Sequence, residues 1–181
     1  MSEPDANMFE VLPGLPGVGP YPEQFSATGK GTYHEGFVVK FHPRSSESWV
    51  GNFQSGRHGF TGALPHPDGR TVIVVAGGQA YHVDPETRVL LRQFGGRISE
   101  VMKEQGRGLL IFADDLRLWA MSASGTRRET RRISWDGIRG LTLDGDSIVG
   151  EAHDPMSDSW CRFSVDVETG KVTGGSYRAH W

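Results

Sequence analysis

The sequence predicts an all-β fold, a small propeller-like array of about four antiparallel β-meander repeats. Beyond residue 31, short runs of β-branched and aromatic residues alternate with turn residues. One plan of apolar strand, polar turn, aromatic strand and second turn recurs at 71–88, 108–125 and 147–170. Equivalent positions lie 37 and then 45 residues apart, near the roughly 40–45 residues of a propeller blade. A twisted β-sandwich or an open barrel with the same meander is the alternative.

The N-terminal segment differs from the rest of the chain. Residues 11–31 contain five glycines and four prolines, so they cannot hold a helix or a central strand for any length. We therefore expect a Gly/Pro-rich arm over residues 1–31 and a single all-β domain over residues 32–181. An early strand pair within residues 36–53 supplies the fourth repeat.

Strand-like runs follow one another along this domain. The clearest are GFVVKF (36–41), WVGNF (49–53), TVIVVAGG (71–78), AYHV (80–83), VLLRQF (89–94), GLLIFA (108–113) and LRLWAM (116–121). Further on, Asp144-Gly145 lies between two apolar runs, which is typical of a hairpin turn. Only ISEVMKEQG (98–106) has apolar residues at helical spacing, and it predicts a turn or two of helix at most.

Composition narrows the protein class. No apolar run approaches the roughly 20 residues of a membrane-spanning helix. The polar, acidic start lacks the features of a secretory signal, and the only cysteine, Cys161, excludes an internal disulfide, so we expect a cytoplasmic protein. A net charge of −3 argues against general affinity for nucleic acid.

Charge is unevenly distributed along the chain. Residues 97–132 hold eight basic and five acidic side chains, whereas residues 133–160 hold six acidic and one basic. The second segment also carries Trp135 and Trp160, and tryptophans frequently anchor protein interfaces. An acidic surface with aromatic anchors is therefore predicted there, although charges that merely face water are the plainer reading.

Residues 150–177 pack acidic side chains, a histidine, a tryptophan and the cysteine into one stretch. The stretch does not match a calcium-binding loop, because Met156 lies between Asp154 and Asp158 at a position that requires an oxygen ligand. The glycine that the pattern requires after Asp158 is also missing. His153 offers a single imidazole, and the other histidines are scattered: His34, His42, His58, His66, His82 and His180. We expect a hairpin here, with no metal and no cofactor.

The hairpin has a predicted core face. Alternation along the second strand points one set of side chains inward: Cys161, Phe163, Val165 and Val167. By this pattern Cys161 is a small buried hydrophobe rather than a nucleophile.

Catalytic motifs are absent from the sequence. It contains neither a phosphate-binding G-x-x-x-x-G-K-[ST] loop nor a G-x-S-x-G nucleophile elbow. Asp114 and Asp115 suit a turn better than a catalytic carboxylate pair. The arginines at 127, 128, 131 and 132 lack the interleaved aromatic residues of nucleic-acid platforms. No catalytic residue is predicted.

SWDGIRGL (134–141) followed by GEAHDPMSDSWCRFSVDVETGKVTGGSY (150–177) resembles the closing signature of small uncharacterised bacterial β-rich proteins. The resemblance extends over roughly residues 50–177. It implies a bacterial origin and brings no activity with it.

We expect a non-enzymatic protein-binding module, and a toxin-neutralising immunity protein is the sharpest version of this reading. The expected binding residues are Trp135, Asp136, Asp154, Asp158 and Trp160. The partner is expected to be another protein, such as a toxin, with neither nucleic acid nor a membrane involved, and a basic partner would favour this reading over an enzyme. Two alternatives stay open: a small enzyme with a site assembled from His82, Asp114 and His153, or an accessory structural subunit.

Overall fold

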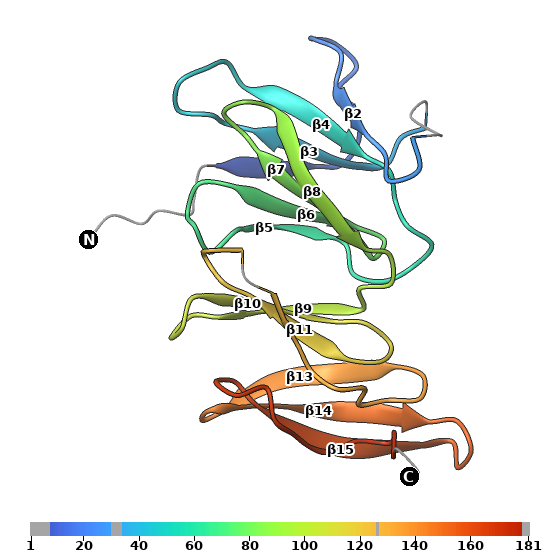
Figure 1. The fold of residues 1–181 in the computed structure, drawn as a ribbon. Helices are drawn as coiled ribbons and strands as arrows, with labels where there is room; N and C mark the ends of the chain where they lie inside the picture. Colours follow the sequence, from blue (N-terminus) through green and yellow to red (C-terminus); the bar gives the residue numbers. More distant parts are fainter. Residues whose placement is uncertain (1–7, 30–33, 126, 179–181) are drawn as a thin grey trace. The chain divides into compact units, whose positions relative to one another are not determined.

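The computed structural model describes residues 8–29, 34–125 and 127–178. Within these ranges the chain is all-β: its strands form four four-stranded sheets, mostly antiparallel, and no helix is present (Figure 1). No sheet closes on itself as a barrel in this part of the chain. The chain divides into two compact units, unit 1 over residues 1–97 and unit 2 over residues 98–181.

Unit 1 contains two sheets. The first has the order β1-β3-β4-β2, with the bounds Phe9–Leu12, Phe37–Phe41, Trp49–Phe53 and Glu23–Phe25. The second is a simple meander of β5 to β8, with the bounds Gly62–Pro65, Val72–Ala76, Gln79–Asp84 and Val89–Gly95. The only parallel pair among the described strands is β2 with β4.

Unit 2 contains two further meanders. One runs from β9 to β12, with the bounds Glu100–Glu104, Leu109–Ala113, Leu118–Met121 and Arg127–Glu129. The other runs from β13 to β16, with the bounds Ile138–Asp144, Ser147–Asp154, Ser159–Asp166 and Val172–Gly174. Each meander has the four strands of a propeller blade.

The repeats predicted from the sequence are the central strand pairs of the four sheets: β3 with β4, β6 with β7, β10 with β11, and β14 with β15. The aligned positions Tyr81, Leu118 and Phe163 are all buried, at 0%, 1% and 3% exposure. The all-β prediction is therefore confirmed, although the strand pairs differ in register: Tyr81 lies opposite Val74, whereas Leu118 lies opposite Ala113.

The helical turn expected within residues 98–106 is wrong, because this segment forms β9 and pairs with β10. A nine-residue segment is too short to hold a helix by itself, whereas pairing satisfies its backbone groups. The buried Glu104 carboxylate fixes the following turn by accepting the N–H groups of Gly106, at 3.0 Å, and Arg107, at 2.6 Å.

The N-terminal segment supplies two short strands. β1 pairs with β3, β2 pairs with β4, and both lie at edges of the first sheet, where prolines nearby remove no ladder hydrogen bond. Phe25 on β2 is buried and stacks on Phe53 with ring centroids 4.6 Å apart. The segment expected as an arm over 1–31 therefore contributes to the core of unit 1.

Each unit has its own hydrophobic core. In unit 1 the core joins aromatic rings of the first sheet to β6 and β7 of the second, including Phe41, Phe53 and Tyr81. In unit 2 it joins β10 and β11 to β14 and β15, including Ile111, Phe163 and Val165. Within the described ranges, no helix has the length and apolar character needed to cross a membrane.

Candidate functional site

Serine hydroxyls hold three segments of unit 2 together: residues 133–137, the β14–β15 hairpin and residues 175–177. The buried Ser134 hydroxyl donates to the carbonyl of Gly137, at 2.7 Å. The Ser176 hydroxyl donates to the carbonyl of His153, at 2.6 Å, and accepts the N–H of Trp135, at 3.1 Å. Backbone bonds add to this framework, including the His153 N–H to the Gly137 carbonyl at 2.9 Å. The loop that carries Trp135 is thereby fixed to the hairpin that carries Trp160.

Trp135 is 39% exposed and belongs to an aromatic group. Its ring meets that of Tyr177 edge to face, with centroids 4.7 Å apart. The Arg132 guanidinium lies over both rings, at 5.0 Å from Trp135 and 4.6 Å from Tyr177. Arg132 also donates to the backbone carbonyls of Ser134 and Trp135, and these hydrogen bonds hold its guanidinium over the two rings.

Trp160 is 36% exposed and is held by two other side chains. The Arg139 guanidinium lies 3.8 Å from its ring centroid, and the His153 ring packs at 4.9 Å. Arg139 donates from Nε to the Glu151 carboxylate at 2.9 Å, which orients the guanidinium. Below the ring, Gly137 adopts a positive φ of 108°, a conformation that side chains disfavour.

His153 connects the two tryptophan groups. Its Nδ1 lies 3.1 Å from the carbonyl oxygen of Asp136, and its Nε2 lies 3.2 Å from Oδ1 of Asp158. Three of the five expected binding residues, Asp136, Asp158 and Trp160, therefore contact one histidine, and Trp135 is linked to it through the Ser176 hydroxyl. We call this region the Trp135–Trp160 surface and define it by Arg132, Trp135, Asp136, Arg139, His153, Asp158, Trp160 and Tyr177.

Asp154, the fifth expected residue, has a different role. Its Oδ1 accepts the N–H of Met156, at 3.0 Å, and its Oδ2 accepts the Ser157 hydroxyl, at 2.9 Å. Asp154 therefore fixes the β14–β15 turn, and its carboxylate does not converge with that of Asp158. In that turn Met156 is 92% exposed, and Asp158 adopts a positive φ of 46° with its side chain 97% exposed.

The acidic segment 133–160 does not form one patch. Asp144 and Asp146 lie at the β13–β14 turn, the opposite end of β14 from Asp154. Eight residues of strand separate the two ends by about 25 Å. Asp146 is also paired with Arg107 at 2.6 Å. Only Asp136, Glu151, Asp154 and Asp158 belong to the tryptophan end, where Arg132 and Arg139 offset part of their charge.

Sequence reasoning missed Arg132, Arg139, His153 and Tyr177 as parts of this surface. Tyr177 lies beyond the last strand, and its position follows from backbone pairing, since its N–H donates to the Ile133 carbonyl at 2.9 Å. The GGSY sequence (174–177) was the one sign in the sequence that the chain turns before Tyr177. Its glycines adopt positive φ angles of 78° and 90°, and they turn the chain back toward residue 133.

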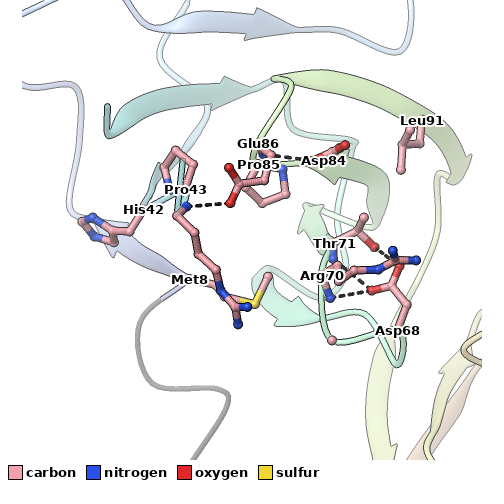
Figure 2. Close-up of a pocket in the computed structure, with 12 residues that line it drawn as sticks. Met8, His42, Pro43, Asp68, Arg70, Thr71, Asp84, Pro85, Glu86 and Leu91 are labelled. Carbon is pink, nitrogen blue, oxygen red and sulfur yellow. Dashed lines mark hydrogen bonds between the residues drawn. The ribbon is translucent and has the colours of Figure 1, made fainter. Parts of the chain in front are cut away.

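Unit 1 contains a pocket of about 890 Å³, which sequence reasoning did not anticipate. Figure 2 shows Asp68, Arg70 and Thr71 grouped along one wall and Pro43, Pro85 and Glu86 along another. Glu86 joins two loops there, since its carboxylate accepts the backbone N–H of Arg44 at 2.6 Å and that of Ser45 at 3.1 Å.

Beside this pocket lies a polar cluster of His66, Asp68, Thr71 and His82. Of the described residues, His66, Asp68 and His82 form the one group of three whose potential metal-ligand atoms lie within 4.8 Å of one another. The rings of His66 and His82 stack with centroids 4.5 Å apart. These two histidines are thus not scattered, as the sequence suggested, whereas His180 lies outside the described residues.

The residues considered for an enzyme site have other partners. His82 belongs to unit 1 and contacts Thr71 and His66. Asp114 belongs to unit 2 and accepts the N–H groups of Leu116 and Arg117, so it fixes the β10–β11 turn. Cys161 is half-buried, and Phe163, Val165 and Val167 of the same face are buried, as the alternation predicts.

Comparison with known proteins adds no identification. No protein-family model matches the chain, and no curated protein matches its sequence. The resemblance to small bacterial β-rich proteins over roughly residues 50–177 therefore stays a prediction.

Proposed function

We propose that the chain is a non-enzymatic protein-binding module and that its partner docks on the Trp135–Trp160 surface. One observation carries this proposal: two partly exposed tryptophans, 25 residues apart in the sequence, are fixed to one another through His153 and a serine framework. Tryptophans are enriched among residues that dominate binding energy. Anchors that are already ordered lose little conformational entropy on binding.

The charges around the anchors indicate the chemistry of the partner. Arg132 and Arg139 each cover one tryptophan face, so the remaining edges of the rings are available for an apolar pocket. The carboxylate of Asp158 contacts His153 and is exposed, and Asp136, next to Trp135 in the sequence, is exposed as well. A protein with apolar pockets and basic side chains at their rim fits this arrangement, because opposite charges at the rim accelerate encounter.

A toxin-neutralising immunity protein of the bacterial cytoplasm is the narrower form of the proposal. A small binding protein that needs no cofactor can neutralise an enzyme by complementary shape and charge. If the neighbouring gene encodes a secreted toxin, cells that express the toxic domain should survive only with this chain present. Survival should be lost when Trp135 and Trp160 are both replaced by alanine. Equal survival with and without the chain contradicts the narrower form alone.

Site-specific photo-crosslinking tests the wider proposal. A photoreactive phenylalanine analogue replaces Met156, which is 92% exposed beside the surface, and the chain is expressed in its own host. The matched control places the same group at Val18, which is 89% exposed in unit 1. We expect one discrete protein adduct at position 156 and none at position 18.

Dependence on the anchors separates specific docking from chance proximity. The adduct at position 156 should disappear when Trp160→Ala is added, because that substitution removes an anchor without touching the core. The proposal is contradicted if no adduct forms at position 156, or if the adduct forms equally well without both tryptophans.

A further inference from the structure

We propose that unit 1 contains a binding site for a divalent transition-metal ion of the zinc class, formed by His66, Asp68 and His82. The ligand atoms of these residues lie within 4.8 Å of one another. The site is independent of the Trp135–Trp160 surface, which belongs to unit 2.

The hairpin loop between β5 and β6 presents two of the three ligands. The loop closes through the N–H of His66, which donates to the Thr71 carbonyl at 2.9 Å. Inside it, Oδ1 of Asp68 accepts the N–H groups of Arg70, at 2.8 Å, and Thr71, at 2.9 Å. One carboxylate oxygen is thus used to orient the side chain, and Oδ2 remains to face the histidines. Hydrogen bonds of this kind orient metal ligands in known sites.

The third ligand comes from β7, the neighbour of β6. Nε2 of His82 lies 2.7 Å from the Thr71 hydroxyl, and that hydroxyl donates to Oδ2 of Asp68 at 2.8 Å. On the other side, Oδ2 of Asp68 lies 3.2 Å from Nδ1 of His66. The carboxylate oxygen therefore stands between the two imidazoles, directly next to one and one hydroxyl away from the other.

His66 provides an independent sign of a missing partner. The residue is only 3% exposed, and its Nε2 has no hydrogen-bond partner among the described residues. Its Nδ1 lies 3.2 Å from both the backbone nitrogen and Oδ2 of Asp68, and with the ring proton on Nδ1 facing that carboxylate oxygen, Nε2 keeps a free lone pair. Buried ring nitrogens are normally satisfied, so a buried imidazole with an unsatisfied nitrogen beside a carboxylate and a second imidazole suits an ion.

Burial and hydrogen bonds shift the pKa values of two residues of this cluster. Burial raises the pKa of Asp68, but hydrogen bonds from the Arg70 and Thr71 N–H groups and the Thr71 hydroxyl outweigh it and bring the pKa to about 2. Burial, followed by the nearby His66, lowers the pKa of His82 below its ordinary value.

The ligand set indicates the class of ion. Two imidazoles and one carboxylate suit zinc and its neighbours, whereas calcium and magnesium prefer oxygen ligands throughout. An ion bonded at about 2.1 Å holds its ligand atoms no more than about 4.2 Å apart, so small side-chain rotations close the present spread. Asp68 and Thr71 also line the pocket of about 890 Å³, which gives an ion a route of entry.

Titration of the full chain, prepared without a polyhistidine tag and stripped with a chelator, tests the site. Zn²⁺ binding is measured by calorimetry and Co²⁺ binding by visible absorption, which reports the coordination geometry. Asp68→Asn keeps an oxygen to accept the Arg70 and Thr71 N–H groups but removes the charged ligand. His82→Gln removes an imidazole, and His58→Ala is the matched control because His58 is an exposed histidine of the same unit.

We expect one ion per chain for the unmodified protein and for the His58→Ala variant. Both Asp68→Asn and His82→Gln should weaken Zn²⁺ binding at least tenfold and reduce the Co²⁺ absorption. If His82→Gln does not fold, Asp68→Asn alone decides, since it preserves the turn. Absence of saturable binding to the unmodified chain overturns the site, and so does unchanged affinity in Asp68→Asn.

Discussion

The ring of His153 lies 4.9 Å from the ring of Trp160, centroid to centroid, while both of its nitrogens face oxygen atoms of neighbouring aspartates. His153 thus packs against the Trp160 ring and also connects the loop that contains Asp136 to the β14–β15 hairpin. One imidazole, that of His153, thus contacts several residues of the Trp135–Trp160 surface.

Replacing His153 with alanine should weaken partner binding about tenfold, because Trp160 loses one supporting face and Asp158 loses its contact. The residue is only partly buried, so the free energy of unfolding should change by about 1 kcal/mol or less. Calorimetric titration with the crosslinked partner checks the affinity, and urea unfolding checks the stability. A large loss of stability with no loss of affinity would show that His153 serves the fold alone.

Asp158→Asn should slow association with the partner without much effect on dissociation, because the side chain is 97% exposed and lies at the rim of the surface. The effect should shrink as salt rises, since exposed charges are screened over about 10 Å at 0.1 M. Stopped-flow association at several salt concentrations measures this. Asp144→Asn, at the far end of the strand pair, is the control and should change nothing.

Phe163→Ala should lower the free energy of unfolding by about 3–5 kcal/mol, because the ring is 3% exposed in the core of unit 2. The ring also fills the space above Gly150, its cross-strand partner, where an added Cβ would meet it at 2.8 Å. Urea unfolding monitored by circular dichroism is the measurement. A cost below about 1 kcal/mol would mean that β15 is out of register.

Asp68 should make the stability of unit 1 fall at low pH. Its pKa is about 2 in the folded chain against 3.8 ordinarily, so its contribution is present above about pH 4 and is lost as pH falls through 2. The group is partly exposed, so we expect about 1–2 kcal/mol. Unfolding midpoints between pH 6 and pH 2 should decline less steeply in Asp68→Asn than in the unmodified chain. Parallel declines would contradict this assignment.

Strand positions were predictable from the sequence because the repeats combine apolar alternation with turn residues. Phe163, Val165 and Val167 alternate with polar neighbours, and one face must be buried. The segment 98–106 misled because helical spacing over nine residues is weak, and pairing with β10 decided its structure.

The candidate sites were only partly predictable, because contacts between distant segments decide them. Trp135 and Trp160 were identified as exposed aromatics, but their link to Tyr177 depends on how residues 175–177 return to residue 133. Likewise, His66 lies in the β5–β6 loop and His82 on β7, and the pairing of β6 with β7 brings their rings together. The net charge of residues 133–160 wrongly suggested a single acidic patch. The acidic residues instead lie at the two turns that flank β14, at opposite ends of that strand.

The dissociation rate of the partner captured at position 156 tests the binding surface most directly. The unmodified chain is compared with Trp135→Ala, Trp160→Ala and Tyr21→Ala, the last being a 99% exposed aromatic of unit 1. We predict that each tryptophan substitution raises the dissociation rate at least tenfold, as loss of an interface anchor does, and that Tyr21→Ala leaves it unchanged. Unchanged dissociation in both tryptophan variants, or an equal increase in Tyr21→Ala, would contradict docking on the Trp135–Trp160 surface.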